Sequence, residues 1–292
     1  MPHIIVIGSN GQLGSDLVKV LRQSPGNRVT GLTHADLDVT NFQEARAALS
    51  SLTPNVVLNT AAFHQVDKCE EQLDLTFTTN AFALKNLATV CKELDSVLVH
   101  FSTDYVFGHD QNRKIPYRES DLPGPVNAYG VSKLAGEHFI QYIAEKYFII
   151  RVAGLFGVTG SSGKGGNFIE TMLRIAREKG VVKVKDDEFT TPTSTSQVAA
   201  NVRELIKTSH YGLYHMTSQG ECSWHQFATE IFRQTATKVE CIPVSSKEVV
   251  TFAKRPRYTV LDNAGLQRIG LDKMGSWQSA LTKYLQDKNS DR

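Results

Sequence analysis

A glycine turn near the N-terminus constrains the fold of this chain more than any other feature. The run Gly8-Ser9-Asn10-Gly11-Gln12-Leu13-Gly14 lies between an apolar segment, Ile4 to Ile7, and a segment with helical spacing of apolar residues. Gly8 permits a tight turn, Gly11 lets the backbone approach a pyrophosphate, and Gly14 lets helix and strand pack closely. These glycines are expected to bind a dinucleotide, although a turn that serves packing alone is the simpler alternative.

Short β-branched runs alternate with helical segments through the first half of the chain. The predicted strands are Ile4–Ile7, Arg28–Leu32, Val56–Asn59, Ser96–Phe101 and Tyr147–Val152. The predicted helices between and after them are Gly14–Gln23, Phe42–Leu52, Leu75–Leu94, Tyr129–Glu145 and Asn167–Glu178. Such alternation is typical of a parallel sheet. We predict an α/β fold with a doubly wound (Rossmann) sheet over residues 1–155, and a smaller substrate-binding lobe over 156–292 from which some segments return to the sheet.

The composition excludes several classes of protein. Thirty-two Lys and Arg residues against 30 Asp and Glu residues leave a net charge of +2, which is too small to indicate a nucleic-acid partner. The four cysteines are scattered, without the spacing of a metal site, and are expected to be reduced core thiols. No segment approaches the roughly 20 apolar residues of a membrane helix, and no signal peptide is recognisable. We predict a cytoplasmic protein without a membrane partner.

The residues after the second predicted strand bear on the choice of cofactor. An NAD site usually has Asp or Glu at this point, where the carboxylate binds the adenosine ribose. Here Thr33 and His34 follow the strand, and the nearest acids are Asp36 and Asp38. Asp38 could contact the adenine from its loop, and His34 would tolerate a 2'-phosphate. Both NADPH and NADH are therefore cofactor candidates.

Tyr129 and Lys133 are separated by one helical turn and lie on the same helix face. A phenol with a pKa of about 10 is a poor acid-base catalyst at neutral pH, and a nearby ammonium is expected to lower that pKa. Lys133 could also hydrogen-bond the nicotinamide ribose. This spacing alone is common on solvated helices, but here Thr103 precedes it at the end of a buried strand, where open α/β sheets bind ligands. We predict that Thr103, Tyr129 and Lys133 are the catalytic residues of an NAD(P)-dependent oxidoreductase.

The segment after the third predicted strand contains small and acidic residues. Ala61 and Ala62 suit a chain that passes close under a cofactor, although close packing explains them equally well. Asp67 and Glu70 follow, and we interpret them as a solvated acidic face rather than as a metal site. No metal is predicted for the protein.

Along nearly its whole length the sequence resembles the extended short-chain dehydrogenase/reductases, and within them the dTDP-4-dehydrorhamnose reductase family. The matching stretches are GSNGQLG at 8–14, LDVTN at 37–41, NTAAFHQVDKCE at 59–70, STDYVFG at 102–108, NAYGVSKLAGE at 127–137, GGNFIETMLRIARE at 165–178, TTPT at 190–193, GLYHMTSQGECSWHQFA at 212–228 and KRPRYTVLDN at 254–263. The resemblance implies hydride transfer from a nicotinamide cofactor to C4 of dTDP-4-dehydro-L-rhamnose, with dTDP-L-rhamnose as the product.

The resemblance also implies roles for individual residues. It makes Thr103, Tyr129 and Lys133 the catalytic set, with Tyr129 and Lys133 also at the cofactor. The further cofactor contacts that it implies, together with those expected from the motifs, are at Gly8, Asn10, Gly11, Gln12, Leu13, Gly14, Asp38, Ala61 and Ala62. The implied substrate contacts are at Thr103, Asp104, Tyr105, Asn167 and Arg255.

Two features of the sugar side are specific to this chain. Where the family commonly has Trp, this sequence has Gly154, which is expected to remove an aromatic wall from the sugar pocket. The glycine-rich segment Gly157–Gly166 is predicted to close over the nucleotide sugar, with Lys164 at the diphosphate. A merely flexible connection is the alternative for this segment.

Two other functions stay open at this point. Nucleotide-sugar epimerases and dehydratases share the fold, but dehydratases commonly have Asp-Glu after the strand-end Thr, whereas here Asp104 and Tyr105 follow. A regulatory subunit of methionine adenosyltransferase also resembles this family and acts by binding another protein. The complete set of Thr103, Tyr129 and Lys133 favours an enzyme with a nucleotide-sugar substrate, and a homodimer is an open alternative to a monomer.

Overall fold

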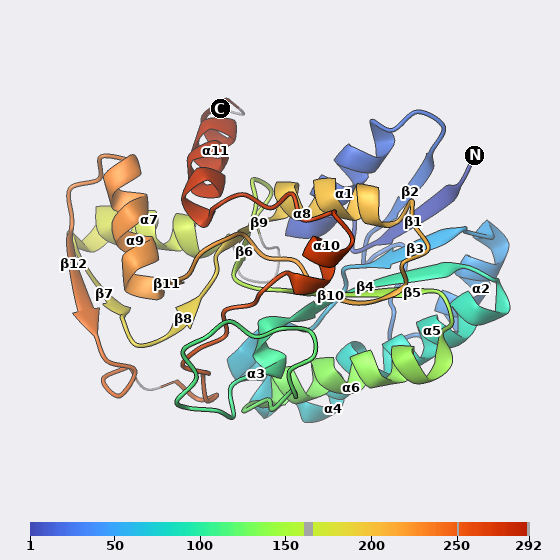
Figure 1. Cartoon of the computed structure of the whole chain (residues 1–292), viewed down its shortest axis with the longest axis horizontal. Coiled ribbons are helices and arrows are strands. Elements are labelled where there is room, and N and C mark those ends of the chain that lie inside the picture. The colour runs from blue at the N-terminus through green and yellow to red at the C-terminus, as the bar shows by residue number, and fades with distance from the viewer. Residues whose placement is uncertain (161–165, 250, 291–292) are drawn as a thin grey trace.

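A six-stranded sheet lies at the centre of the molecule (Figure 1), and the computed structural model describes residues 1–160, 166–249 and 251–290. The strand order is β10-β5-β4-β3-β1-β2, and every neighbouring pair is parallel. The strands are β1 (His3–Ile7), β2 (Arg28–Leu32), β3 (Val56–Asn59), β4 (Val97–Thr103), β5 (Tyr147–Val152) and β10 (Gly212–His215). The predicted doubly wound sheet is confirmed.

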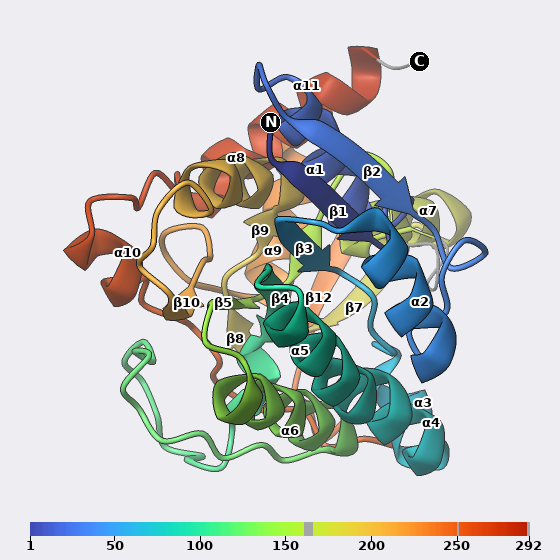
Figure 2. The ribbon, with the colours of Figure 1, turned by 90° about the vertical axis from the view of Figure 1, so that its right-hand side faces the viewer.

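Helices cover both faces of this sheet (Figure 2). One layer consists of α1 (Gln12–Arg22) and α8 (Thr195–Leu205), and the other of α2 (Phe42–Leu52), α5 (Ala83–Glu93) and α6 (Ala128–Ile143). Successive residues of a strand point to opposite faces, so in β1 Ile4 and Val6 pack in the α1/α8 core while Ile5 and Ile7 pack in the other. None of the helices in the described part of the chain is long and apolar enough to cross a membrane.

The predicted helix Leu75–Leu94 is confirmed as one helical segment, in which α4 (Leu73–Phe77) continues through a π-helical turn, η1 (Thr78–Phe82), into α5. The side chain of Asn80 in this turn accepts from the amide of Phe63 and donates to its carbonyl, each at 2.9 Å. The close approach of α6 requires Gly136, since a Cβ there would lie 2.3 Å from the Asn80 carbonyl oxygen. The π-helical turn thus fixes the loop after β3, as such turns often do near functional sites.

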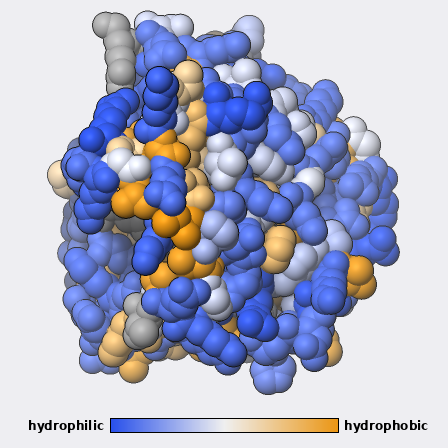
Figure 3. Space-filling model, turned by 90° about the vertical axis from the view of Figure 1, so that its left-hand side faces the viewer, coloured by the Kyte–Doolittle hydropathy of each residue, from blue (hydrophilic) through white to orange (hydrophobic). Residues whose placement is uncertain are grey.

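The second half of the chain forms a lobe on one side of the sheet, on the left of Figure 1. Its helices are α7 (Phe168–Lys179), α9 (Trp224–Gln234) and α11 (Trp277–Ser290), whereas α10 (Ala264–Arg268) packs beside β10, with Leu266 in the α1/α8 core. Its short strands pair as β7 (Val181–Lys185) with β12 (Glu240–Val244), β8 (Phe189–Thr190) with β11 (Cys222–Ser223), and β6 (Leu155–Phe156) with β9 (Thr193–Ser194). The segment from α8 to β10 returns to the sheet. Figure 3 shows a band of apolar residues on the outer face of this side.

Candidate active site

A cavity of about 890 Å³ lies at the carboxyl ends of the strands. The chain runs from β1 outward to β2 and then crosses to β3 on the other side of β1, so the winding direction reverses there. Ligands of doubly wound sheets bind at such a reversal. The predicted site residues that line the cavity are Gly8, Asn10, Gly11, Gln12, Leu13, Asp38, Ala61, Ala62, Thr103, Asp104, Tyr105, Tyr129, Lys133 and Asn167. The cavity lining does not include Gly14 or Arg255.

The glycine turn forms one wall of the cavity. Gly8 has a φ of +79°, in the left-handed region, and a Cβ there would lie 2.5 Å from the Thr60 hydroxyl oxygen. Gly14 lies behind the turn, where a Cβ would be 2.1 Å from the Gly8 carbonyl oxygen, so its role is the close packing of helix on strand. Gly11 is the N-cap of α1 and provides no capping side chain. The first amides of α1 therefore remain available to an anion.

We expect Gly11→Val to weaken NADPH binding, because a branched side chain would stand where the backbone approaches the pyrophosphate. A hydrogen bond to a charged group is worth about 1.5–3 kcal/mol, so the loss of one such contact predicts a roughly 10- to 100-fold rise in the Kd of NADPH. Fluorescence titration of the purified variant measures this effect. An unchanged Kd would contradict the placement of the cofactor at this turn.

The loop after β2, with His34 and Asp38, lines the end of the cavity where the adenosine of the cofactor is predicted to bind. Asp38 accepts from the amide and hydroxyl of Thr40, at 2.9 and 2.7 Å. Burial raises the pKa of Asp38, but these hydrogen bonds and His34 outweigh it and leave the pKa below its usual value. Asp36 accepts from the amide and hydroxyl of Thr33 and is not part of the lining. The lining at this end therefore combines the carboxylate of Asp38, which Thr40 already engages, with the imidazole of His34.

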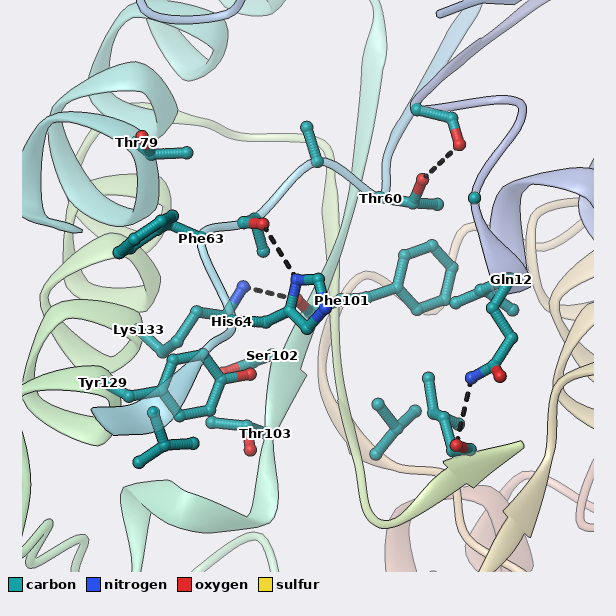
Figure 4. A pocket seen from close by; sticks show the side chains of 18 of the residues that line it. Gln12, Thr60, Phe63, His64, Thr79, Phe101, Ser102, Thr103, Tyr129 and Lys133 are labelled. Atoms are coloured by element: carbon teal, nitrogen blue, oxygen red, sulfur yellow. Dashed lines mark hydrogen bonds between the residues drawn. The ribbon is translucent and has the colours of Figure 1, made fainter. Parts of the chain in front are cut away.

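Thr103 and Tyr129 meet at the end of β4 (Figure 4). Thr103 is the last residue of β4, and its hydroxyl accepts from the amide of Tyr105 at 3.1 Å. Tyr129 lies in the first turn of α6, which Asn127 caps by accepting from the amide of Gly130 at 2.8 Å. The N-cap of α6 thereby fixes the phenol beside the strand-end hydroxyl.

Burial raises the pKa of Tyr129 above its ordinary value, and a hydrogen bond with Thr103 opposes this rise. The lowered pKa expected from the sequence is wrong for this structure, because desolvation outweighs the favourable contacts. A phenol with a raised pKa stays protonated at neutral pH. Such a group is suited to donate a proton rather than to accept one.

Lys133 is buried and points toward β4. Its Nζ atom donates to the carbonyl oxygen of Phe101 at 2.7 Å and lies 2.9 Å from Nε2 of His100. Burial lowers the pKa of Lys133 to about 7, while Glu137, one helical turn further along α6, acts in the opposite direction. The ammonium has three donors, and these two contacts leave one for a ligand in the cavity.

Asp104 connects the sheet to the lobe, a role that sequence reasoning missed. Its Oδ1 atom accepts from the Thr103 hydroxyl at 3.1 Å, and its Oδ2 atom accepts from Thr259 at 2.5 Å and from Thr190 at 3.4 Å. Burial raises the pKa of Asp104 to about 6, against these hydrogen bonds. Asp104 lines the cavity as predicted, but both of its oxygens are engaged by threonines.

A buried ion pair between Arg151 and Glu137 connects β5 to α6 near the strand ends. Sequence reasoning did not predict it. Arg151 of β5 donates to Glu137 of α6 at 2.6 Å, and Ser102 of β4 hydrogen-bonds to the same carboxylate. Arg151 also lies 3.4 Å from His215 of β10. The available signal was a charged residue within an otherwise apolar strand, which demands a buried partner.

Aromatic side chains of the lobe line the end of the cavity where the sugar is predicted to bind. Gly154 has a φ of +49°, and a Cβ there would lie 3.3 Å from Pro192 and 3.6 Å from the Trp224 ring. Trp224 and Phe168 both line the cavity, with ring centroids 4.7 Å apart. The expectation that the aromatic wall is missing is therefore wrong, because Trp224 comes to the same place from α9. Its distance in the chain from Gly154 hid this contact from sequence reasoning.

The remaining predicted substrate residues have structural contacts. Asn167 caps α7 by accepting from Glu170 at 3.1 Å and donates to the Gly157 carbonyl at 3.2 Å. Arg255 donates to Asp67 at 2.7 Å, away from the cavity lining. Within the predicted lid Gly157–Gly166, residues 161–165, including Lys164, lie outside the described residues.

The interpretation of Asp67 and Glu70 as a solvated acidic face is wrong, because their carboxylates connect the segment after β3 to the start of α6 and to the chain near Ala253. They lie in α3 (Val66–Glu71), where Glu70 accepts from the amide of Ala128 and Asp67 from the amide of Ala253, each at 2.9 Å. Among the described residues no group of three or more His, Cys, Asp or Glu side chains is arranged to hold a metal ion.

A phenol, a lysine and a strand-end hydroxyl that face a dinucleotide turn across the reversal of a doubly wound sheet are the arrangement of an extended short-chain dehydrogenase/reductase. The family model described as the RmlD substrate binding domain matches residues 2–290. The chain therefore belongs to the dTDP-4-dehydrorhamnose reductase family, and the resemblance noted in the sequence is confirmed.

Individual relatives cover almost the whole chain. The dTDP-4-dehydrorhamnose reductase of Streptomyces griseus is 34% identical over 289 residues, which are 97% of this chain and 92% of that protein. The crystal structure of a dTDP-4-dehydrorhamnose reductase from Clostridium acetobutylicum is similar with a TM-score of 0.93 and 39% identity, covering 98% of this chain and 99% of that one. That of the Bacillus anthracis enzyme, in complex with NADP, is similar with a TM-score of 0.91 and 34% identity over the same shares.

Proposed function

We propose that the protein is an NAD(P)H-dependent reductase of a dTDP-linked 4-keto sugar, with dTDP-4-dehydro-L-rhamnose as substrate and dTDP-L-rhamnose as product. The observation that carries this proposal is the position of Thr103 and Tyr129 at the end of β4, on the same cavity as the glycine turn. The Streptomyces griseus relative is named as a dTDP-4-dehydrorhamnose reductase, and the Bacillus anthracis structure is described as a complex with NADP. The site therefore agrees with the family in its reaction class.

The residues around the glycine turn fit a dinucleotide. The first turn of α1 is uncapped, and a Cβ at Gly8 would fill the space beside it. The Oε1 atom of Gln12 is buried without a hydrogen-bond partner among the described residues, while its Nε2 atom donates to the Leu155 carbonyl at 3.0 Å (Figure 4). When bound, a nicotinamide cofactor supplies the hydride that reduces the sugar carbonyl. The first amides of α1, beginning with that of Gln12, would hold its pyrophosphate, since the amides of Gly8 and Gly11 already donate to the carbonyls of Leu32 and Gly8.

The chain's own residues handle the proton. Tyr129, which burial keeps protonated, donates its phenolic proton to the C4 oxygen of the sugar as negative charge develops there. Thr103 lies on the same cavity, and its hydroxyl, which donates to Asp104 in this structure, would turn to the carbonyl oxygen and orient it against the phenol. Lys133 offers its remaining N–H to the ribose and to the phenolate that Tyr129 becomes.

Net oxidation of NAD(P)H by the purified protein with a panel of dTDP-linked 4-keto sugars tests the proposal. The expected result is stoichiometric oxidation with dTDP-4-dehydro-L-rhamnose, and dTDP-L-rhamnose as the product by NMR. Epimerases and dehydratases recycle their cofactor, so sugar conversion without net oxidation would overturn it. A protein that oxidises no cofactor with any sugar, but copurifies stoichiometrically with another enzyme, would instead have a regulatory role.

The position of His34 at the adenosine end of the cavity leads to a prediction about the choice between NADPH and NADH. His34→Asp is expected to lower kcat/KM for NADPH about 10- to 100-fold relative to NADH, because a carboxylate would face the 2'-phosphate. The measurement compares both cofactors at saturating sugar. His210→Asp, the same change at an exposed position outside the cavity lining, should leave the ratio unchanged. An unchanged ratio in His34→Asp would place the 2'-phosphate elsewhere.

We also propose that the enzyme works in the cytoplasm. All four cysteines are free thiols, namely Cys69, Cys91, Cys222 and Cys241. Free thiols are usual in a reducing compartment.

A further inference from the structure

His100 contacts Lys133 and has no part in the mechanism described above. Lys133 is 1% exposed, and its two hydrogen-bond partners, the Phe101 carbonyl and the His100 ring, are both neutral groups of β4. The nearest carboxylate on its own helix is that of Glu137, which Arg151 and Ser102 already engage. A buried ammonium depends strongly on such contacts, because burial favours its uncharged form.

We propose that His100 is a positioning residue that keeps Lys133 charged and aimed at the cavity. His100 is 1% exposed, and burial, followed by the proximity of Lys133, holds its pKa well below the ordinary value. The ring is therefore neutral and carries one proton, so that one nitrogen donates and the other accepts.

The contact with Lys133 determines which nitrogen accepts. Nζ of Lys133 lies 2.9 Å from Nε2 of His100, and an ammonium has no lone pair to offer, so Nε2 must accept. The proton of the neutral ring is then on Nδ1. On the neighbouring strand His100 stands in register with Asn59, whose Nδ2 atom lies 3.4 Å from Nδ1, a long contact.

This arrangement stabilises the ammonium and constrains its direction. A hydrogen bond to the charged form of a group favours that form, so His100 raises the proportion of charged Lys133. Because His100 and Phe101 occupy two of the three N–H groups, the third is directed by elimination toward the cavity that Lys133 lines. That N–H supports the phenolate of Tyr129. Here the inference rests on the proposed function.

Other ionisable groups surround this contact and share its pH dependence. They are Tyr129 and Glu137 on α6, His64 in the loop after β3, Arg151 on β5 and Asp104 after β4. Lys133, with its pKa lowered to about 7, titrates within the working range and is expected to set the high-pH limb of kcat.

The test compares His100→Met with His100→Gln, two side chains of similar length of which only glutamine offers an oxygen acceptor to Nζ. In His100→Met, kcat at saturating NADPH and sugar is expected to fall roughly 10- to 100-fold, and its high-pH limb to move down by about one pH unit. His100→Gln should recover most of both effects. The same two changes at His138, an exposed residue of α6, should leave rate and profile unchanged.

Equal pH profiles in the parent, His100→Met and His100→Gln would overturn the inference, even if the rate falls, since a merely structural role predicts that result. A second measurement needs neither variant nor substrate: nitrogen NMR of the histidine rings in the intact protein. It should find His100 neutral with its proton on Nδ1, and a proton on Nε2 or a charged ring would overturn the inference. A wild-type protein that oxidises no NADPH would contradict the proposed function but leave this tautomer result standing.

Discussion

Tyr129→Phe is expected to lower kcat by about 100- to 10,000-fold, the range for loss of a general acid. The substitution removes one oxygen atom at the end of β4 and leaves the glycine turn untouched. The ring packing against Tyr105, whose centroid lies 6.0 Å away, is kept. The Kd of NADPH should therefore stay close to that of the parent. Steady-state turnover and fluorescence titration of the same preparation measure the two quantities.

The matched control is Tyr142→Phe, which removes the same atom from an exposed tyrosine of α6. Its kcat is expected to equal that of the parent. Wild-type turnover in Tyr129→Phe would remove the phenol from the mechanism and leave Thr103 as the only hydroxyl of the predicted catalytic set.

Gly130→Ala is expected to damage the site strongly by adding a single methyl group beside Tyr129. A Cβ at Gly130 would lie 2.2 Å from the Tyr105 carbonyl oxygen and 2.9 Å from Pro125. Since the first of these is a backbone atom, the start of α6 must move away from the turn after β4, and Tyr129 moves with it. A misplacement of about 1 Å can cost roughly 100-fold in rate, and overpacking costs about 1–3 kcal/mol in the free energy of unfolding.

Gly180→Ala separates the rate effect from a general loss of stability. Gly180 ends α7 with a φ of +66°, and no atom lies within 4 Å of a Cβ there. Left-handed alanine should cost about 1–2 kcal/mol of stability without changing kcat. Denaturant unfolding and turnover of both variants test this contrast. If Gly130→Ala were as active as Gly180→Ala, the close approach of α6 would have no catalytic importance.

The parts of the fold that could be predicted are those that local spacing determines. The strand Arg28–Leu32 and the helix Phe42–Leu52 have the predicted bounds, because period-two and helical patterns of apolar residues identify single elements. The π-helical turn at Thr78–Phe82 could not be predicted this way. It depends on the contacts of Asn80 with Phe63 and with Ser132, which is 52 residues further along the chain.

The site, like the fold, was predictable where short motifs determine it and not where distant segments meet. The glycine turn and the helical spacing of Tyr129 and Lys133 are short motifs, so the sequence predicted that both belong to one site, and the structure places both on one cavity. The prediction that the pKa of Tyr129 is lowered was wrong, because the burial of a side chain cannot be estimated from sequence spacing. Trp224 was missed because nothing near it in the sequence indicates that it reaches Gly154.

The threonine contacts of Asp104 have a consequence for the modularity of this enzyme. Asp104 is the neighbour of Thr103, yet its Oδ2 atom is held by Thr190 and Thr259, which belong to the part of the chain that forms the lobe. These hydrogen bonds therefore connect the end of β4, where Thr103 lies, to the lobe that is predicted to bind the sugar. A lobe transplanted from a relative with another sugar preference would have to bring both hydroxyl groups with it. Without them, the buried carboxylate of Asp104 would lose two of its three threonine donors, and the graft would alter the rate of the chemical step together with the choice of sugar.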